Sequence, residues 1–167
     1  ALLGVVFAVY MGLCAVLAAR RLGAGQVVLM GRHADRTDLG AGFGATGIVL
    51  ASGEEGAEEV RKLTGGHGVD TVLECVGSLQ ALTTSFGAVR DGGVISRVGV
   101  PSYTDGPIGM DMIMRNITLT GGVDPAGPLY QLLERQTPLG GGAQPFQSLL
   151  PLRVGYPTLV ATRFRLV

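Results

Sequence analysis

Apolar positions switch between strand-like and helix-like spacing most clearly across residues 69–101. Val69–Glu74 is a short, mostly apolar run with β-branched residues, which predicts a buried strand. The apolar positions that follow at helical spacing are Leu79, Leu82, Phe86 and Val89. This spacing predicts a helix with Ser78 as its N-cap, and Asp91-Gly92-Gly93 is predicted to end it.

Val94–Val100 is a second apolar run, and Pro101 ends it. Two strands that are joined by a helix run parallel, so residues 69–101 predict a β-α-β unit. Sheets of this kind bind ligands at the carboxyl ends of their strands. The pattern therefore predicts a binding site at Glu74–Gly77 and Val98–Pro101.

The same alternation of strand and helix patterns extends from residue 2 to residue 120. The predicted strands are Leu2–Val9, Gln26–Met30, Thr46–Leu50 and Ile117–Thr120, and the predicted helices are Gly12–Leu22, Thr37–Phe43 and Glu54–Leu63. Gly23 is expected to end the first helix. This order predicts an α/β fold of the Rossmann type, a doubly wound parallel sheet of about six strands with helices on both faces in three layers.

The pattern weakens toward the C-terminus. The methionines of residues 107–116 (Met110, Met112 and Met114) alternate as in a half-buried strand. From Leu139 onward, glycines and prolines interrupt any periodicity. We therefore predict one domain over residues 1–137 and a weakly structured or divergent tail over residues 138–167.

Several motifs resemble the cofactor domain of medium-chain dehydrogenases, the zinc-dependent alcohol dehydrogenase superfamily. They are TGGHGVDTVLECVG (Thr64–Gly77), VRDGGVISRVGVP (Val89–Pro101), RNITLTGG (Arg115–Gly122), GLCAVLAARRLGA (Gly12–Ala24) and FGAT (Phe43–Thr46). The resemblance implies the NAD(P)-binding half of an oxidoreductase that moves hydride between nicotinamide and an alcohol or aldehyde. It also implies a catalytic zinc in a second domain. We expect no catalytic or metal-binding residue in this chain, and no activity of the chain alone.

Members of that family carry G-x-G-x-x-G where the first strand meets the first helix, and the backbone there approaches the pyrophosphate. Only the third glycine, Gly12, is present in this sequence, and Phe7 and Val9 stand in the first two places. Tyr10, Met11 and Gly12 are the residues expected at the pyrophosphate. A side chain at the second position blocks close approach, so we expect weak binding.

The end of the second predicted strand bears on the choice between NADP and NAD. An acidic residue there binds the ribose 2′-hydroxyl, whereas arginine accommodates a 2′-phosphate. Gly31 stands in the acidic place, and Arg32 and Arg36 follow. The two arginines could form a phosphate-binding fork or could be solvated side chains. NADP is therefore the favoured cofactor and NAD the alternative.

The loops after residues 74 and 97 supply the remaining cofactor-binding candidates. They are Cys75, Val76, Gly77, Val98, Gly99 and Val100. Cys75 has no histidine or basic residue beside it in sequence to activate a thiolate, so we interpret it as a small packing residue. The family resemblance further implies a homodimer contact through residues 107–116.

Composition narrows the class of partner. The formal net charge is zero and the pI is about 7.0, which favours neither nucleic acid nor an acidic surface as a partner. Two cysteines provide no disulfide framework, so a cytoplasmic location is expected. The uncharged run Ala1–Ala19 leaves a membrane-anchored protein as one alternative to an oxidoreductase fragment. A nucleotide-binding or structural module without catalysis is the other.

Overall fold

The computed structural model describes residues 2–106, 108–121 and 159–163. Within them lies one six-stranded sheet of order β2-β1-β6-β3-β4-β5. The strands are β1 (Gln26–Met30), β2 (Gly47–Val49), β3 (Val69–Glu74), β4 (Val89–Arg97), β5 (Thr118–Gly121) and β6 (Leu159–Arg163). The pairs β1–β2, β3–β4 and β4–β5 are parallel, which confirms the predicted β-α-β unit.

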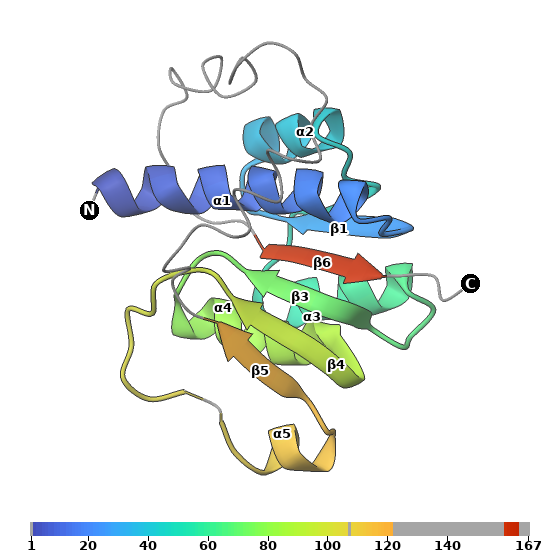
Figure 1. Ribbon diagram of the computed structural model, residues 1–167, viewed down its shortest axis with the longest axis vertical. Coiled ribbons are helices and arrows are strands. Elements are labelled where there is room, and N and C mark those ends of the chain that lie inside the picture. Colours follow the sequence, from blue (N-terminus) through green and yellow to red (C-terminus); the bar gives the residue numbers. More distant parts are fainter. Residues whose placement is uncertain (1, 107, 122–158, 164–167) are drawn as a thin grey trace.

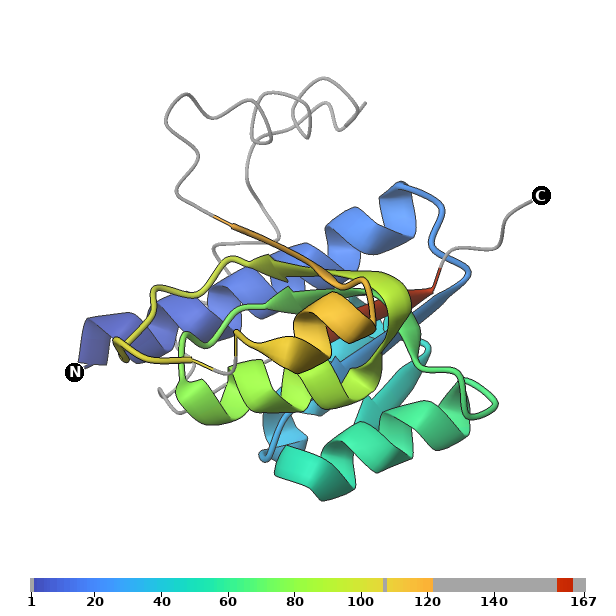
Figure 2. The same cartoon turned by 90° about the horizontal axis from the view of Figure 1, so that it is seen from below.

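Helices cover both faces of this sheet. They are α1 (Leu2–Arg21), α2 (Ala34–Gly42), α3 (Gly53–Leu63), α4 (Leu79–Ala88) and the short α5 (Met110–Met114). Alternate residues of β1 face opposite sides, as a strand requires. Val27 and Leu29 pack with α1, whereas Val28 and Met30 pack with α3 and α4. Figure 2 shows α1 on one side of the sheet and α3 and α4 on the other, the three layers that the sequence predicts.

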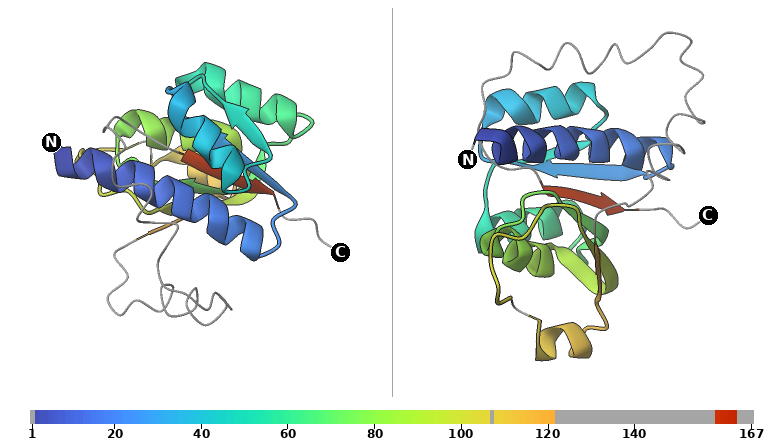
Figure 3. Two further views of the ribbon diagram at one scale, coloured as in Figure 1. Left: turned by 90° about the horizontal axis from the view of Figure 1, so that it is seen from above. Right: turned by 60° about the vertical axis from the view of Figure 1, so that its left-hand side comes forward.

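The predicted strand Leu2–Val9 is wrong, because residues 2–21 form one continuous helix. No proline and no glycine pair separates residues 2–9 from the helical pattern that follows, and an apolar run without such a break suits a buried helix as well as a strand. Gly23 follows this helix with a φ of +88° and ends it, as expected. The N-terminal part of α1 projects past the ends of the strands (Figures 1 and 3).

The strand between β1 and β3 comes from the C-terminal part of the chain. β6 lies antiparallel to both neighbours, with Ala161 opposite Val28 on one side and opposite Val72 on the other. Residues 138–167 were expected to lack regular structure, and residues 159–163 differ from that expectation. The rest of the predicted tail lies outside the described residues, and the boundary at residue 137 remains a prediction.

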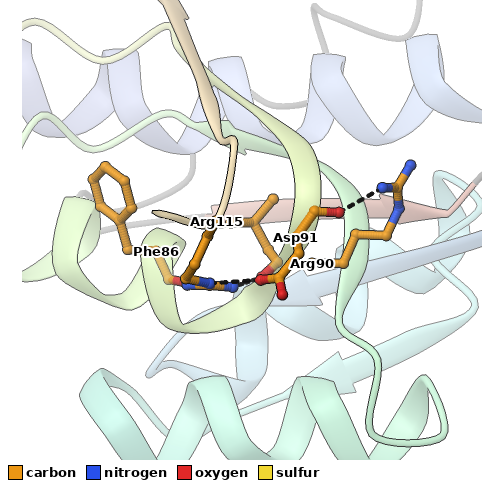
Figure 4. A network of polar contacts seen from close by, with 5 residues as sticks. Phe86, Arg90, Asp91 and Arg115 are labelled. Carbon is orange, nitrogen blue, oxygen red and sulfur yellow. Dashed lines mark hydrogen bonds and ion pairs between the residues drawn. The ribbon is translucent and has the colours of Figure 1, made fainter. Parts of the chain in front are cut away.

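The junction between α4 and β4 also differs from the prediction. The helix ends at Ala88 and the strand begins at Val89, so Asp91-Gly92-Gly93 lies inside β4. Arg115 fixes this junction, as Figure 4 shows. Its guanidinium donates to the carbonyl oxygens of Phe86 (2.8 Å) and Val89 (2.6 Å) and to Asp91 Oδ1 (2.7 Å).

The methionines of residues 110–114 form α5 and not a strand. Methionine is a good helix former, and Asp111 in the first turn suits the positive end of the helix dipole, so the alternation of methionines alone misled the prediction. Met110 and Met114 are 70% and 75% exposed. In the described part of the chain, no helix is long and apolar enough to cross a membrane.

Candidate functional site

Two loops meet at the carboxyl ends of the neighbouring parallel strands β3 and β4. The first loop, Cys75–Gly77, follows β3, and the second, Val98–Val100, follows β4. Both contain residues that the sequence predicts to bind a cofactor, and the structure brings them together. Val98 and Gly99 donate their backbone N–H groups to the carbonyl oxygen of Glu74, at 2.8 Å each.

Glycine is required where these loops touch. Gly77 has a φ of +79°, and a Cβ built on it would collide with the carbonyl oxygen of Val100. A Cβ on Gly99 would lie 2.6 Å from the backbone nitrogen of Val76 and 2.7 Å from the carbonyl carbon of Cys75. The two loops are therefore packed backbone to backbone, and neither can carry a larger residue at its glycine without moving.

Ser102 adds a second link between the loops. Its backbone nitrogen donates to the carbonyl oxygen of Gly77 at 2.8 Å, and its hydroxyl donates to the same oxygen at 3.0 Å. The segment after β4 is thus tied to the loop after β3 at both ends. Ser78 begins α4 directly beyond this loop, and its Oγ accepts from the N–H of Ala81 at 3.1 Å, which confirms the predicted N-cap.

Glu74 is a fully buried acid at the end of β3. Its Oε1 accepts hydrogen bonds from the backbone N–H groups of Val76 (2.7 Å) and Gly77 (2.8 Å), whereas Oε2 has no hydrogen-bond partner. Burial raises the pKa of Glu74, and the two N–H groups and the nearby guanidinium of Arg97 act in the opposite direction. Protonation of Glu74 therefore depends on a balance between burial, which favours the neutral acid, and these neighbours, which favour the carboxylate.

Arg97 and Tyr103 complete a polar cluster around this acid. Arg97 is the register partner of Glu74 on the adjacent parallel strand, so their side chains lie on the same face of the sheet. The guanidinium carbon of Arg97 lies 5.6 Å from the centre of the Tyr103 ring, within cation–π range. Arg97 Nε and Tyr103 Oη, like Glu74 Oε2, are buried and lack a hydrogen-bond partner.

Cys75 is buried, and its surroundings oppose ionisation. Burial, assisted by the negative charge of Glu74 and by Cys14, raises the pKa of the Cys75 thiol to about 12. Its Sγ lies 3.6 Å from the carbonyl oxygen of Leu73. The thiol is therefore a poor nucleophile at neutral pH, in keeping with the interpretation of Cys75 as a packing residue.

The predicted phosphate-binding arginines lie two strands away, after β1. The N–H of Gly31 donates to the carbonyl oxygen of Val49 at 2.9 Å, which joins the carboxyl ends of β1 and β2. Arg32 follows and is exposed, so its guanidinium is available to a ligand at this edge. Arg36 lies in the first turn of α2, and its side chain is outside the described residues.

Tyr10, Met11 and Gly12 do not form the predicted turn at the start of a helix. They lie in the interior of α1, two turns or more from its first residue, Leu2. Only the first four N–H groups of a helix lack an intrahelical partner. The backbone at residues 10–12 therefore has no free N–H groups for a pyrophosphate, and the strand-to-helix turn predicted at these residues is wrong.

Sequence reasoning missed Arg97, Tyr103 and Ser102 as site residues, and it included Glu74 at the predicted ligand-binding edge without giving its side chain a role. One signal was available, because an acidic residue in an apolar strand is almost never fully buried without partners. Its partners depend on strand register, which the sequence alone does not show. Among the described residues, no group of three His, Cys, Asp or Glu side chains is arranged to hold a metal ion.

Known proteins resemble this chain over the region that forms the site. A family model described as zinc-binding dehydrogenase matches residues 11–126. Sorbitol dehydrogenase of Bacillus subtilis is 33% identical over 105 residues, which are 63% of this chain and 30% of that protein. L-threonine 3-dehydrogenase of Bacillus licheniformis is 34% identical over 114 residues, 66% of this chain and 32% of that protein.

Solved structures agree in fold. Zinc dependent alcohol dehydrogenase 2 from Streptococcus pneumonia, in its apo form, superposes with a TM-score of 0.67 and 27% identity over 73% of this chain and 36% of that chain. A zinc-binding dehydrogenase from Sinorhizobium meliloti 1021, solved bound to NADP, superposes with a TM-score of 0.61 and 28% identity. The match covers 70% of this chain and 36% of that chain. The chain thus spans about a third of the length of the curated relatives it matches.

Proposed function

Because the chain belongs to the zinc-binding dehydrogenase family, we propose that it binds a nicotinamide dinucleotide for an oxidoreductase that transfers hydride between that cofactor and an alcohol or aldehyde. The observation that carries the proposal is the pair of interlocked loops, 75–77 and 98–100. They lie at the carboxyl ends of β3 and β4, where open parallel sheets bind their ligands. The family model covers both loops.

The residues present fit one part of a dinucleotide and not another. Gly31 and the exposed Arg32 suit a 2′-phosphate, since Gly31 places no carboxylate at the end of β1 to repel it. The helix interior at residues 10–12 does not suit a pyrophosphate. The bound cofactor would supply the hydride chemistry, and this chain would hold and orient it. We therefore propose weak binding with a preference for NADP over NAD.

Titration calorimetry on the chain with NADP and with NAD tests this proposal. Arg32→Ala should weaken NADP binding by about tenfold, the loss of one charge-assisted pair of about 1.5 kcal/mol, and should leave NAD binding unchanged. Arg21→Ala is a matched control, because Arg21 is an exposed arginine at the other end of α1 from the predicted site. Equal losses for both cofactors in Arg32→Ala would refute the preference.

We propose that the chain does not oxidise alcohols by itself, since the zinc and most of the proton relay belong to a second domain in this family. Steady-state assays with NADP, added zinc and simple alcohols should show no turnover above buffer. Binding without turnover supports a cofactor-binding half. Turnover by the pure chain would contradict the proposal that catalysis needs the second domain, and the absence of any dinucleotide binding would favour a structural module.

A cytoplasmic location is proposed from the neutral charge and the low cysteine content.

We also propose a homodimer contact through residues 107–116. Ile108, Met110, Ile113 and Met114 are more than half exposed, and the edge strand β5 lies beside them with its outer edge unpaired in the described sheet. Such a combination of exposed apolar side chains and a free strand edge is typical of an interface. Ile113→Glu should shift the mass measured by light scattering to that of the monomer. Leu63→Glu, at an exposed leucine on α3, should not.

A further inference from the structure

One residue links both loops of the candidate site. The side chain of Glu74 holds the first loop through the N–H groups of Val76 and Gly77, and its backbone carbonyl holds the second through Val98 and Gly99. All four hydrogen bonds are 2.7–2.8 Å long. Among the described residues, no other residue forms hydrogen bonds to one loop through its side chain and to the other loop through its backbone.

The two loops cannot rearrange independently. The close approach at Gly77 and Gly99 leaves no room for one backbone to move against the other, and Ser102 ties the far end of the second loop to the Gly77 carbonyl. A change in the first loop must therefore be transmitted to the second. Because Glu74 fixes the first loop, it fixes the geometry of the whole edge of the sheet at β3 and β4.

Ionisation of Glu74 strengthens its two hydrogen bonds to the first loop, whereas burial of the carboxyl group opposes ionisation and raises its pKa. Hydrogen bonds to an ionised carboxylate are roughly twice as strong as bonds between neutral groups. Among the residues whose side chains the structure describes, the ionisable groups that interact with Glu74 are Arg97 from β4, Tyr103 from the segment after β4 and Cys75 next in the chain. Helix α4, which packs on β3, contributes no charged residue. Arg97 is thus the one cation in this set, and it favours the ionised form of the acid.

We propose that Glu74 is the positioning residue of the candidate cofactor site, and that Arg97 supports it by favouring the ionised form of its carboxyl group. Glu74 does not touch the cofactor. It acts through the Cys75–Gly77 loop and, by way of the interlocked glycines, through Val98–Val100. The part of this inference that concerns cofactor affinity rests on the function proposed above, whereas the part that concerns loop geometry does not.

The experiment compares the wild-type chain with Glu74→Gln, Arg97→Met and the double variant. Glu74→Gln keeps an acceptor at the Oε1 position but loses the charge. The control is Arg90→Met, which removes the 2.6 Å ion pair with Asp70 at the opposite end of the same two strands. Thermal melting followed by circular dichroism checks that each variant folds.

The ligand-free readout is amide NMR. In the wild-type chain, the amide proton shifts of Val76 and Gly77 should follow one titration, and Arg97→Met should move its midpoint to higher pH. Glu74→Gln should abolish the titration and reduce the hydrogen-exchange protection of both amides about tenfold, with no change at Val60 in α3. The inference would be overturned if the two amide proton shifts of the wild-type chain did not change with pH. It would also be overturned if hydrogen-exchange protection of the two amides were the same in Glu74→Gln as in wild type.

The ligand readout is NAD affinity against pH, because NAD carries no 2′-phosphate that titrates in this range. Affinity of the wild-type chain should fall about tenfold as the pH drops through the titration of Glu74. In Glu74→Gln, NAD affinity should be low and independent of pH. Arg97→Met should reduce NAD affinity less in the Glu74→Gln background than in the wild-type chain. A pH profile shared by wild type and Glu74→Gln would overturn the role in the site. If wild type binds no dinucleotide while the amides respond as expected, the proposed function fails and the loop inference stands.

Discussion

Replacing Gly99 by alanine tests whether the two loops are packed as closely as the structure indicates. The added Cβ would lie 2.6 Å from Val76 N and 2.7 Å from the Cys75 carbonyl carbon. Both neighbours are backbone atoms, which are held by the Glu74 hydrogen bonds and cannot rotate away as a side chain would. Overpacking of this kind costs about 1–3 kcal/mol in free energy of unfolding. For a domain of this size, that corresponds to a fall in the melting temperature of roughly 2–12 °C.

The assay is chemical denaturation of wild type, Gly99→Ala and Gly42→Ala. Gly42 is the matched control, because it ends α2 without a positive φ and nothing lies within 4 Å of a Cβ built on it. The control should be neutral or slightly stabilising, by up to about 1 kcal/mol. Dinucleotide affinity, where present in wild type, should fall in Gly99→Ala only. Equal midpoints for the two variants would refute the close packing of the loops.

Three further outcomes follow from other contacts. Arg115→Ala should lower the free energy of unfolding by about 2–4 kcal/mol, because it removes three hydrogen bonds of the guanidinium, two of them to part-buried backbone carbonyls, and Arg61→Ala, at an exposed position of α3, should change it little. Burial raises the pKa of Glu74 above its unfolded value of about 4.3, so stability relative to Glu74→Gln should be greatest below that value and should fall as the pH rises through the folded pKa. Iodoacetamide should alkylate Cys75, whose pKa is about 12, only after denaturant unfolds the chain, and mass spectrometry of the peptide would reveal any labelling of the native state.

The sequence predicted the parts of the fold that depend on local pattern. The bounds of β1 and β3 were correct to the residue, because each is an apolar run bounded by polar or glycine-rich segments. Residues 2–9 were assigned wrongly for the opposite reason. An apolar run continuous with a helix carries no local signal that separates strand from helix, and the decision depends on what else fills the sheet. Here β6 occupies the place between β1 and β3.

The candidate site shows the same limit. The loops after β3 and β4 could be located because parallel strands end at a common edge. Their mutual support could not be predicted, since it depends on which backbone atoms of the two loops meet once β3 and β4 are paired. The glycines were visible in the sequence, but whether a glycine provides a positive φ, as Gly77 does, or a close contact, as Gly99 does, depends on the partner backbone.

The expected weak affinity follows from comparing what the chain retains with what it lacks. A dinucleotide is usually held at three places, which are the adenosine ribose, the pyrophosphate and the loops at the strand ends. In the proposed function Arg32 provides for the first and the interlocked loops for the third, whereas the interior of α1 offers no free N–H groups for the second. The pyrophosphate carries two negative charges, and without donors its desolvation opposes binding. Because the loops are already fixed by Glu74, little ordering cost is added on binding, and any affinity that the chain shows must come from this pre-organised edge.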